Sequence, residues 1–211
     1  EQTTAFGFAT QSQSEVGLSK TFKEWLTVQA IYLPTHELLS LYPGFVSLYE
    51  EMHIEYDETY RDLCLLLGRP LRKGPRLSKI KELLGPLEKS MNGKIVLEQT
   101  GKFYLDLATG KMEIPLVAEG LRKLGTLAQL IANGSLIDKG FLFWDEPEAN
   151  LNPKLIKGVA QTILDVAKGG TQTFVATHSL FFMRQLYLLF NQEKYGGLEV
   201  RFFGLHRDKE D

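Results

Sequence analysis

The stretch that decides the fold is Gly140-Phe141-Leu142-Phe143-Trp144-Asp145-Glu146-Pro147-Glu148-Ala149-Asn150-Leu151-Asn152-Pro153. Apolar residues run directly into Asp145 and Glu146, which predicts a buried parallel strand with two acids at its carboxyl end. Open α/β sheets bind their ligands at that end of the strands. Asn152 can cap a helix that begins at Pro153, the position that proline favours. The stretch therefore predicts a strand, an acidic tip and a helix at a ligand-binding edge.

A second strand is predicted over residues 173–177, directly before His178. Since parallel strands end at one edge of a sheet, His178 is expected to lie close to Asp145 and Glu146. Asp145 can hold Mg²⁺, which needs only one or two carboxylates beside phosphate oxygens. Glu146 can orient or deprotonate a water that attacks a γ-phosphate, and His178 can hydrogen-bond that phosphate. The three residues together predict nucleotide chemistry.

Strands and helices alternate through the second half of the chain. The predicted elements are a helix with Leu121, Leu124, Leu127 and Leu130 on its buried face and Asn133-Gly134 as its stop, a helix over 153–168, the strand 173–177, a helix over 179–190 and a strand over 198–203. This alternation predicts an α/β fold with a mostly parallel sheet flanked by helices.

The first half of the chain predicts additions to this sheet. Strands are expected over 5–8 and 27–33, and Thr35 is expected to cap a short helix through Leu41. Helical periodicity recurs to about residue 90, so residues 35–92 are interpreted as an inserted helical lobe. Residues 95–99 and 103–107 flank a Thr-Gly-Lys turn and predict an antiparallel hairpin.

The composition is that of one soluble globular domain. The chain has 211 residues, 44% apolar and 24% charged, and a net charge of −2, which gives no general case for nucleic acid or an anionic membrane. Its one cysteine, Cys64, excludes an internal disulfide and fits a reducing compartment. No apolar run reaches the roughly 20 residues of a membrane span. A cytoplasmic protein without membrane contact is expected.

A phosphate-binding loop of the form Gly-x-x-x-x-Gly-Lys-Ser/Thr is absent from the sequence. Gly17-Leu18-Ser19-Lys20-Thr21 is superficially similar, but Ser14 and Ser19 stand at the required glycine positions. We therefore expect the segment that makes most triphosphate contacts to lie outside these residues, and this chain alone to bind ATP poorly.

The stretch 140–153 resembles the Walker B motif and D-loop of ABC-type ATPases, and Thr177-His178-Ser179 resembles their switch-histidine motif. The motif is similar to that of bacterial AAA-type, ABC-like ATPases, in the branch that also contains the chromosome-maintenance, recombination-repair and overcoming-lysogeny ATPase heads. Residues 112–182 carry the close resemblance, and Tyr32–Leu39 a weaker one. The resemblance implies an ABC-like P-loop NTPase head over 1–211 with 112–211 as its core.

The resemblance also implies roles for single residues. Asp145 would hold Mg²⁺, Glu146 would be the catalytic carboxylate, and His178 would contact the γ-phosphate of ATP. Ala118, Glu119 and Gly120 stand at the signature motif, and Asn152 stands in the D-loop; both would face the ATP of a second head. Ala118 replaces the serine of the transporters, and Glu119 adds negative charge, which Arg122 or Lys123 could offset unless they lie on an exposed helix face.

The implied function is an ATP-driven clamp, made by a homodimer or by pairing with a second ATPase head. It would act with an effector such as a nuclease on DNA or RNA, in phage defence or DNA repair. Two alternatives remain open. One is a non-hydrolysing interaction module with this fold, and the other is a metal-dependent nuclease that uses Asp145, Glu146 and Glu148. The nuclease alternative leaves Pro147 and the D-loop-like tail without a role.

Overall fold

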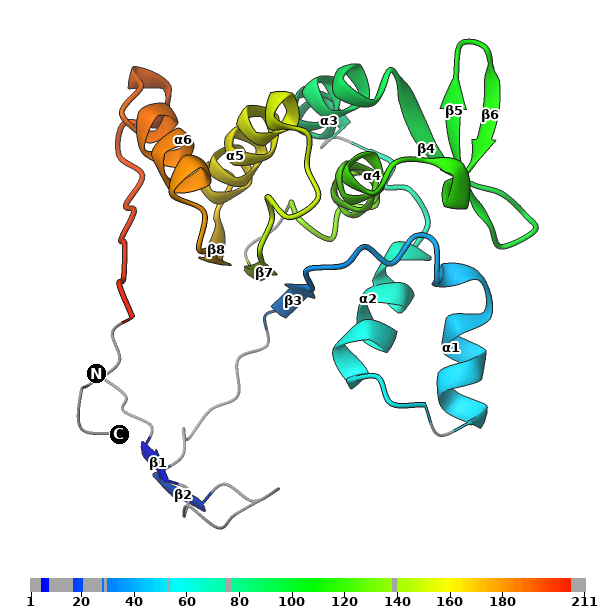
Figure 1. The fold of residues 1–211 in the computed structure, drawn as a ribbon, viewed down its shortest axis with the longest axis horizontal. Coiled ribbons are helices and arrows are strands. Elements are labelled where there is room, and N and C mark those ends of the chain that lie inside the picture. The colour runs from blue at the N-terminus through cyan, green and yellow to red at the C-terminus, as the bar shows by residue number, and fades with distance from the viewer. Residues whose placement is uncertain are drawn as a thin grey trace.

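The structure is a computed structural model that describes residues 5–7, 17–20, 28, 30–52, 54–74, 77–137 and 140–205. It has the predicted α/β architecture (Figure 1). In chain order the elements are β1 (Ala5–Gly7), β2 (Gly17–Lys20), β3 (Ala30–Leu33), α1 (Tyr42–Glu51), α2 (Glu58–Leu67), α3 (Leu77–Met91), β4 (Gly93–Leu97), β5 (Phe103–Leu107), β6 (Gly110–Glu113), the 3-10 helix η1 (Ile114–Leu116), α4 (Glu119–Ala132), β7 (Gly140–Asp145), α5 (Pro153–Lys168), β8 (Thr171–Ala176), α6 (Leu180–Phe190) and the 3-10 helix η2 (Glu193–Tyr195).

A parallel sheet in the order β3-β7-β8 carries the acidic tip. Tyr32 of β3 pairs with Phe143 of β7, which in turn pairs with Phe174 of β8. All three strands therefore end at the same edge, as predicted. Strand β3 joins this edge from more than 100 residues upstream, across the whole helical segment of the first half.

The two faces of this sheet differ in burial. Leu33, Leu142 and Trp144 point to one face and are at most 3% exposed. Phe143 and Phe174 point to the other face, where they are 40% and 43% exposed and their rings stack with centroids 4.7 Å apart. The prediction of a buried strand at 140–145 is therefore correct for one face only, because no described element covers the other.

The segment between β3 and β7 contains α1, α2, α3 and an antiparallel sheet. The predicted hairpin of β4 and β5 is confirmed, and β6 adds a third strand to it. Asp57 caps α2 by accepting a hydrogen bond from the Thr59 amide at 2.9 Å. The interpretation of 35–92 as one inserted lobe remains a prediction.

The predicted helix from Thr35 to Leu41 is wrong. Residues 35–41 form bends and turns, and the first helix begins at Tyr42. The hydroxyl of Thr35 does not cap a helix, because it donates its hydrogen bond to Asp145 instead.

Helices α4 and α5 form most of the core of the second half. Both carry an apolar face at helical spacing, and α3 packs against both of them (Figure 1). The fully or nearly fully buried side chains include Leu124, Leu127, Leu130, Ile131, Val159, Ala160 and Ile163. Each of the buried leucine, isoleucine and valine side chains contributes about 1.5–3 kcal/mol relative to an exposed position. None of the helices in the described part of the chain has the length and hydropathy needed to cross a bilayer.

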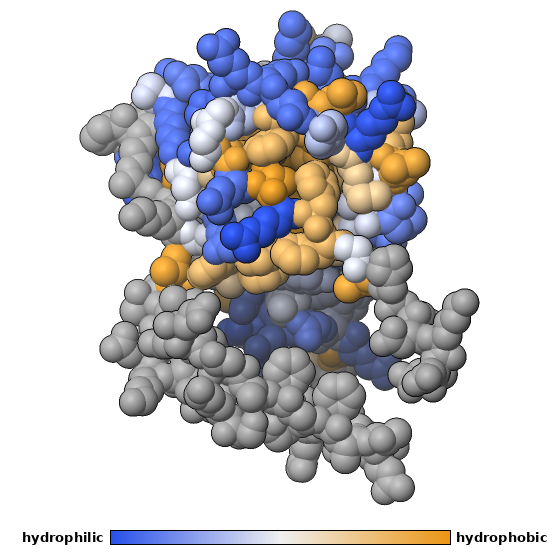
Figure 2. Space-filling view, turned by 90° about the vertical axis from the view of Figure 1, so that its left-hand side faces the viewer, coloured by the Kyte–Doolittle hydropathy of each residue, from blue (hydrophilic) through white to orange (hydrophobic). Residues whose placement is uncertain are grey.

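Helix α6 packs on α5 but leaves much of its own surface uncovered. Leu180, Phe181, Tyr187 and Leu188 are more than half exposed, and Figure 2 shows an apolar area ringed by hydrophilic residues on this side of the molecule. Only Phe182 and Leu189 of this helix are buried.

The predicted strand over 198–203 is absent. These residues are in the described part of the chain, but none is in a strand, and Phe202 and Phe203 are 55% and 84% exposed. An extended segment becomes a strand only when a neighbour satisfies its backbone groups, and β8 pairs with β7 alone among the described strands. The outer predictions at Phe8, Thr27 and Gln29 fall outside the described residues.

Candidate functional site

The backbone turns sharply between the two acids. Asp145 is the last residue of β7, and Glu146 has a φ of 43°, in the left-handed region that non-glycine residues seldom adopt. The Glu146 amide still donates to the carbonyl of Ala176 at 2.9 Å, which ties the turn to β8. Asn150 has a φ of 61° in the same loop. Backbone strain of this kind persists where the surroundings hold it, and it is common at functional sites.

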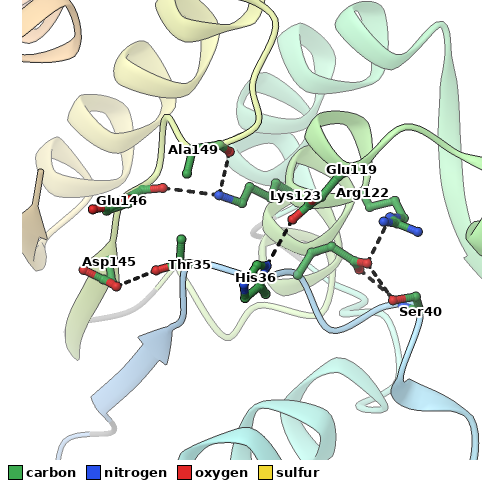
Figure 3. A network of polar contacts seen from close by, with 10 residues as sticks. Thr35, His36, Ser40, Glu119, Arg122, Lys123, Asp145, Glu146 and Ala149 are labelled. Atoms are coloured by element: carbon green, nitrogen blue, oxygen red, sulfur yellow. Dashed lines mark hydrogen bonds and ion pairs between the residues drawn. The ribbon is translucent and has the colours of Figure 1, made fainter. Parts of the chain in front are cut away.

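Asp145 accepts a hydrogen bond from Thr35, the residue that was expected to cap a helix. The Thr35 hydroxyl donates to Asp145 Oδ2 at 2.5 Å (Figure 3). Thr35 follows β3 by two residues, so it reaches the acidic tip from the neighbouring strand. The weak resemblance over Tyr32–Leu39 was the signal that marked this segment, but the pairing of β3 with β7 was needed to place it.

Glu146 and His178 meet, as the sequence predicts. His178 Nδ1 lies 2.7 Å from Glu146 Oε1, and the imidazole is 80% exposed. Because the contact uses Nδ1, the Nε2 atom stays on the opposite side of the ring as a donor or acceptor for a ligand. Glu146 and His178 are thus in contact where two adjacent strands end, and Asp145 is the last residue of one of these strands.

Glu148 has a different environment. Thr177 donates a hydrogen bond to Glu148 Oε1, and the buried Oε2 has no hydrogen-bond partner among the residues that the structure describes. The Thr177 Oγ1 also accepts from the Ser179 amide at 3.0 Å. Glu148 therefore joins the loop after β7 to the loop after β8.

The start of α4 packs against the loop that carries Glu146. Ala118 is the exposed residue before the helix, whereas Gly120 is buried. A Cβ atom on Gly120 would lie 3.0 Å from the carbonyl oxygen of Asn150, so the close approach favours glycine. The predicted signature residues therefore lie beside the D-loop-like loop of their own chain.

Glu119 is paired inside the chain. Its carboxylate lies 3.4 Å from His36 Nδ1 and also bonds the Asn150 side chain. Burial raises the pKa of Glu119, but the hydrogen bonds from Asn150 and His36 outweigh it, so the pKa lies below its usual range. The first turn of α4 thus carries a negative charge, which opposes an anion at this helix N-terminus.

Arg122 and Lys123 do not lie on an exposed helix face, so that interpretation is wrong. Lys123 is 4% exposed, and its ammonium donates to the carbonyls of Glu146 at 3.2 Å and Ala149 at 2.8 Å (Figure 3). Arg122 Nε lies 2.9 Å from the Glu37 carboxylate. Both cations are directed to groups of this chain, because the helix face that carries them is covered.

The environment of Lys123 affects its ionisation. Burial lowers the pKa of the Lys123 ammonium, and the carboxylates of Glu119 and Glu148, with smaller contributions from Glu146 and Asp145, offset only part of that effect.

Asn152 caps α5. Its side-chain oxygen accepts from the Lys154 amide at 3.0 Å, and Pro153 follows at the first helical position, as predicted. The residue is exposed. Its contact with a second head remains a prediction.

The residues fit a Mg²⁺ ion that is shared with phosphate. Thr35 occupies one oxygen of Asp145, which leaves the other as a ligand. Within the described ranges, His, Cys, Asp and Glu side chains form no group of three or more that could hold a metal. A Mg²⁺ ion at Asp145 would therefore take its remaining ligands from phosphate and water, which is the usual mode for this ion.

Comparison with solved structures finds similarity at low sequence identity. One is the Smc head domain from Pyrococcus furiosus with an extended coiled coil, bound to the C-terminal domain of ScpA, at 18% identity and a TM-score of 0.39 over 67% of this chain and 35% of that one. Another is a dimeric ATP-binding cassette in a post-hydrolysis state with ADP and Pi, at 16% identity and a TM-score of 0.33 over 75% of this chain and 56% of that one. The chain thus spans between about a third and just over half of these structures. No curated protein matches it.

The family comparison matches most of the described fold. Residues 32–184 match the family described as "AAA domain, putative AbiEii toxin, Type IV TA system". The matched range begins in β3 and ends in α6, so it contains the acidic tip, the start of α4 and His178. Because the match covers well over half of the 211 residues, the chain belongs to this AAA domain family and is a P-loop ATPase-like domain.

Proposed function

We propose that this chain is the Walker B-containing part of an ATP-hydrolysing, ABC-like head of the bacterial branch that resembles overcoming-lysogeny and recombination-repair ATPases. The observation that carries the proposal is the contact between His178 Nδ1 and Glu146 Oε1, at 2.7 Å, directly after Asp145 at the end of β7 and after the adjacent strand β8. The family supports a nucleotide-binding function of the ATPase type.

In this proposal each residue has its own task. Asp145, oriented by Thr35, is the residue that would hold Mg²⁺, and the bound ion would neutralise charge on the phosphate oxygens. Glu146 accepts a proton from the attacking water or orients it. His178 Nδ1 lies against the Glu146 carboxylate, and Nε2, on the other side of the ring, is the atom that would contact the γ-phosphate.

The triphosphate needs a phosphate-binding segment that the 211 residues do not contain. The parallel sheet has room for it, because β8 pairs only with β7 among the described strands and the face with Phe143 and Phe174 is uncovered. Parallel sheets normally have both faces covered. We propose that a strand and helix that carry this segment complete the sheet beside β8.

A second head would complete the site from the other side. Ala118 and Gly120 at the start of α4, together with Asn152, are the residues proposed to face the partner's nucleotide. The negative charge of Glu119 opposes direct phosphate binding there. The dimeric clamp, and an effector that acts on DNA or RNA in phage defence or repair, are part of the same proposal.

The test is Glu146→Gln in the intact protein, with the phosphate-binding segment present. Turnover of ATP is expected to fall at least 100-fold, because the amide cannot act as a base, whereas ATP binding and ATP-dependent dimerisation persist. Glu113→Gln is the matched control, since Glu113 is exposed at the end of β6. Turnover that survives in Glu146→Gln would refute the role of Glu146.

The same experiment separates the alternatives. A non-hydrolysing interaction module would bind no Mg-ATP in the wild type, and a nuclease would cut DNA without ATP. The nuclease alternative also needs Glu148 as its third acid, but Thr177 already donates a hydrogen bond to one oxygen of that carboxylate.

A further inference from the structure

A buried ammonium at the start of α4 has no role in the chemistry described so far. Lys123 is 4% exposed, although a lysine is seldom buried so completely. Its two hydrogen-bond acceptors are the backbone carbonyls of Glu146 and Ala149, at 3.2 and 2.8 Å. A buried charge destabilises the protein unless such bonds compensate it. Both bonds go to one turn, so that turn is what Lys123 stabilises.

The turn is the one that gives Glu146 its direction. Its backbone closes through the Ala149 amide, which donates to the Glu146 carbonyl at 3.1 Å, the same carbonyl that Lys123 binds. Glu146 needs a φ of 43° to turn from the strand, and this conformation requires support from its neighbours. Lys123 supplies that support from 23 residues upstream.

Other contacts bring the same two segments together. Gly120 allows the first turn of α4 to approach the Asn150 carbonyl, and the Glu119 carboxylate bonds the Asn150 side chain. The neighbouring Arg122 pairs with Glu37 at 2.9 Å, two residues after the Thr35 that holds Asp145 (Figure 3). The start of α4 therefore contacts both the segment that holds Asp145 and the turn that carries Glu146.

We propose that Lys123 is a positioning residue: its ammonium locks the 146–149 turn onto α4 and so sets the direction of the Glu146 carboxylate. The effect on catalysis rests on the proposed ATPase function, whereas the effect on the turn does not. A movement of α4 would reach Glu146 through this lock.

The experiment compares Lys123→Met, Lys123→Arg and wild type in the intact protein. Methionine keeps the length and removes the donors, whereas arginine keeps charge and donors. Lys157→Met is the control, because Lys157 is an exposed lysine on α5.

The first measurement is amide exchange by NMR, without nucleotide. Lys123→Met is expected to speed exchange of the Ala149 and Leu151 amides about tenfold or more, because both belong to the released turn, while amides inside α4 stay protected. Lys123→Arg and Lys157→Met should keep the wild-type rates. Wild-type exchange in a folded Lys123→Met protein would overturn the proposal.

The second measurement is ATP turnover. Lys123→Met is expected to lower kcat about 10- to 100-fold with KM within about twofold, since misplacing a catalytic group by about 1 Å has effects of that size. Lys123→Arg should recover most of kcat. If Lys123→Met does not fold, a folded Lys123→Arg that exchanges and turns over like wild type supports the lock, and one that loses both overturns it. Wild type without turnover, but with the expected exchange rates, would refute the ATPase function and leave the lock intact.

Discussion

The two faces of the β3-β7-β8 sheet are built from alternate residues of the same strands, yet they have opposite surroundings. Leu142 and Trp144 lie in the core at 0% and 3% exposure, whereas Phe143 between them is 40% exposed. The sequence pattern alone does not separate the two faces, because both are apolar. A solvated sheet face would alternate with polar residues, so the apolar Phe143 and Phe174 are typical of a face that another element covers.

The largest difference between the faces should appear on truncation. Leu142→Ala is expected to lower the free energy of unfolding by about 2–5 kcal/mol, because it leaves a cavity in the core next to Trp144. Urea unfolding followed by circular dichroism measures it. A loss below about 1 kcal/mol would mean that this face is not a close-packed core.

A smaller effect is expected one residue further along the strand. Phe143→Ala removes a ring that stacks on Phe174 and is already exposed to water. The free energy of unfolding is therefore expected to fall by about 0.5–1.5 kcal/mol. The same urea experiment compares it directly with Leu142→Ala. Equal losses for the two variants would show that the aromatic face is covered in solution.

Removal of a helix cap at the site sharpens the comparison further. Asn152→Ala deletes the acceptor of the Lys154 amide at the start of α5, so a loss of about 1 kcal/mol is expected. Asn152→Asp is the control, because it keeps an acceptor oxygen. An unchanged midpoint for Asn152→Ala would argue against the cap.

The effect that is smallest near neutral pH concerns Cys64 in α2, which packs against β3. Burial raises the pKa of its thiol from 9.0 to about 12. The folded protein therefore keeps the proton between pH 9 and 12 while the unfolded chain loses it, so this contribution to stability is complete below pH 9 and is lost as pH rises.

Alkylation with iodoacetamide at pH 8 tests the burial of Cys64. The native protein is expected to react at least 100-fold more slowly than the urea-unfolded chain. The thiolate is the reactive form, and burial both disfavours the Cys64 thiolate and keeps the reagent away from the sulfur. Similar rates in both states would contradict a closed core around α2.

Local patterns predicted much of this molecule correctly. The apolar run before Asp145 predicts β7, and Asn152 and Pro153 predict the start of α5, because caps and strand ends depend on neighbours in sequence. The order of β7, β8 and their helices predicts that Glu146 and His178 meet, since parallel strands end at one edge.

Other features depend on contacts between residues far apart in sequence. Thr35 lies 110 positions from Asp145 in the sequence. Only the pairing of β3 with β7 brings its hydroxyl to the Asp145 carboxylate, where it donates a hydrogen bond instead of capping a helix. Residues 198–203 have a strand-like pattern but lack a described partner, and a strand exists only in a pair. Lys123 resembles a solvent-facing cation until α4 packs on the 146–149 turn. Charge and hydropathy along the chain therefore determined the elements and the acidic tip. The tertiary structure decided which side chains support them, because burial and hydrogen bonding are properties of the packed chain.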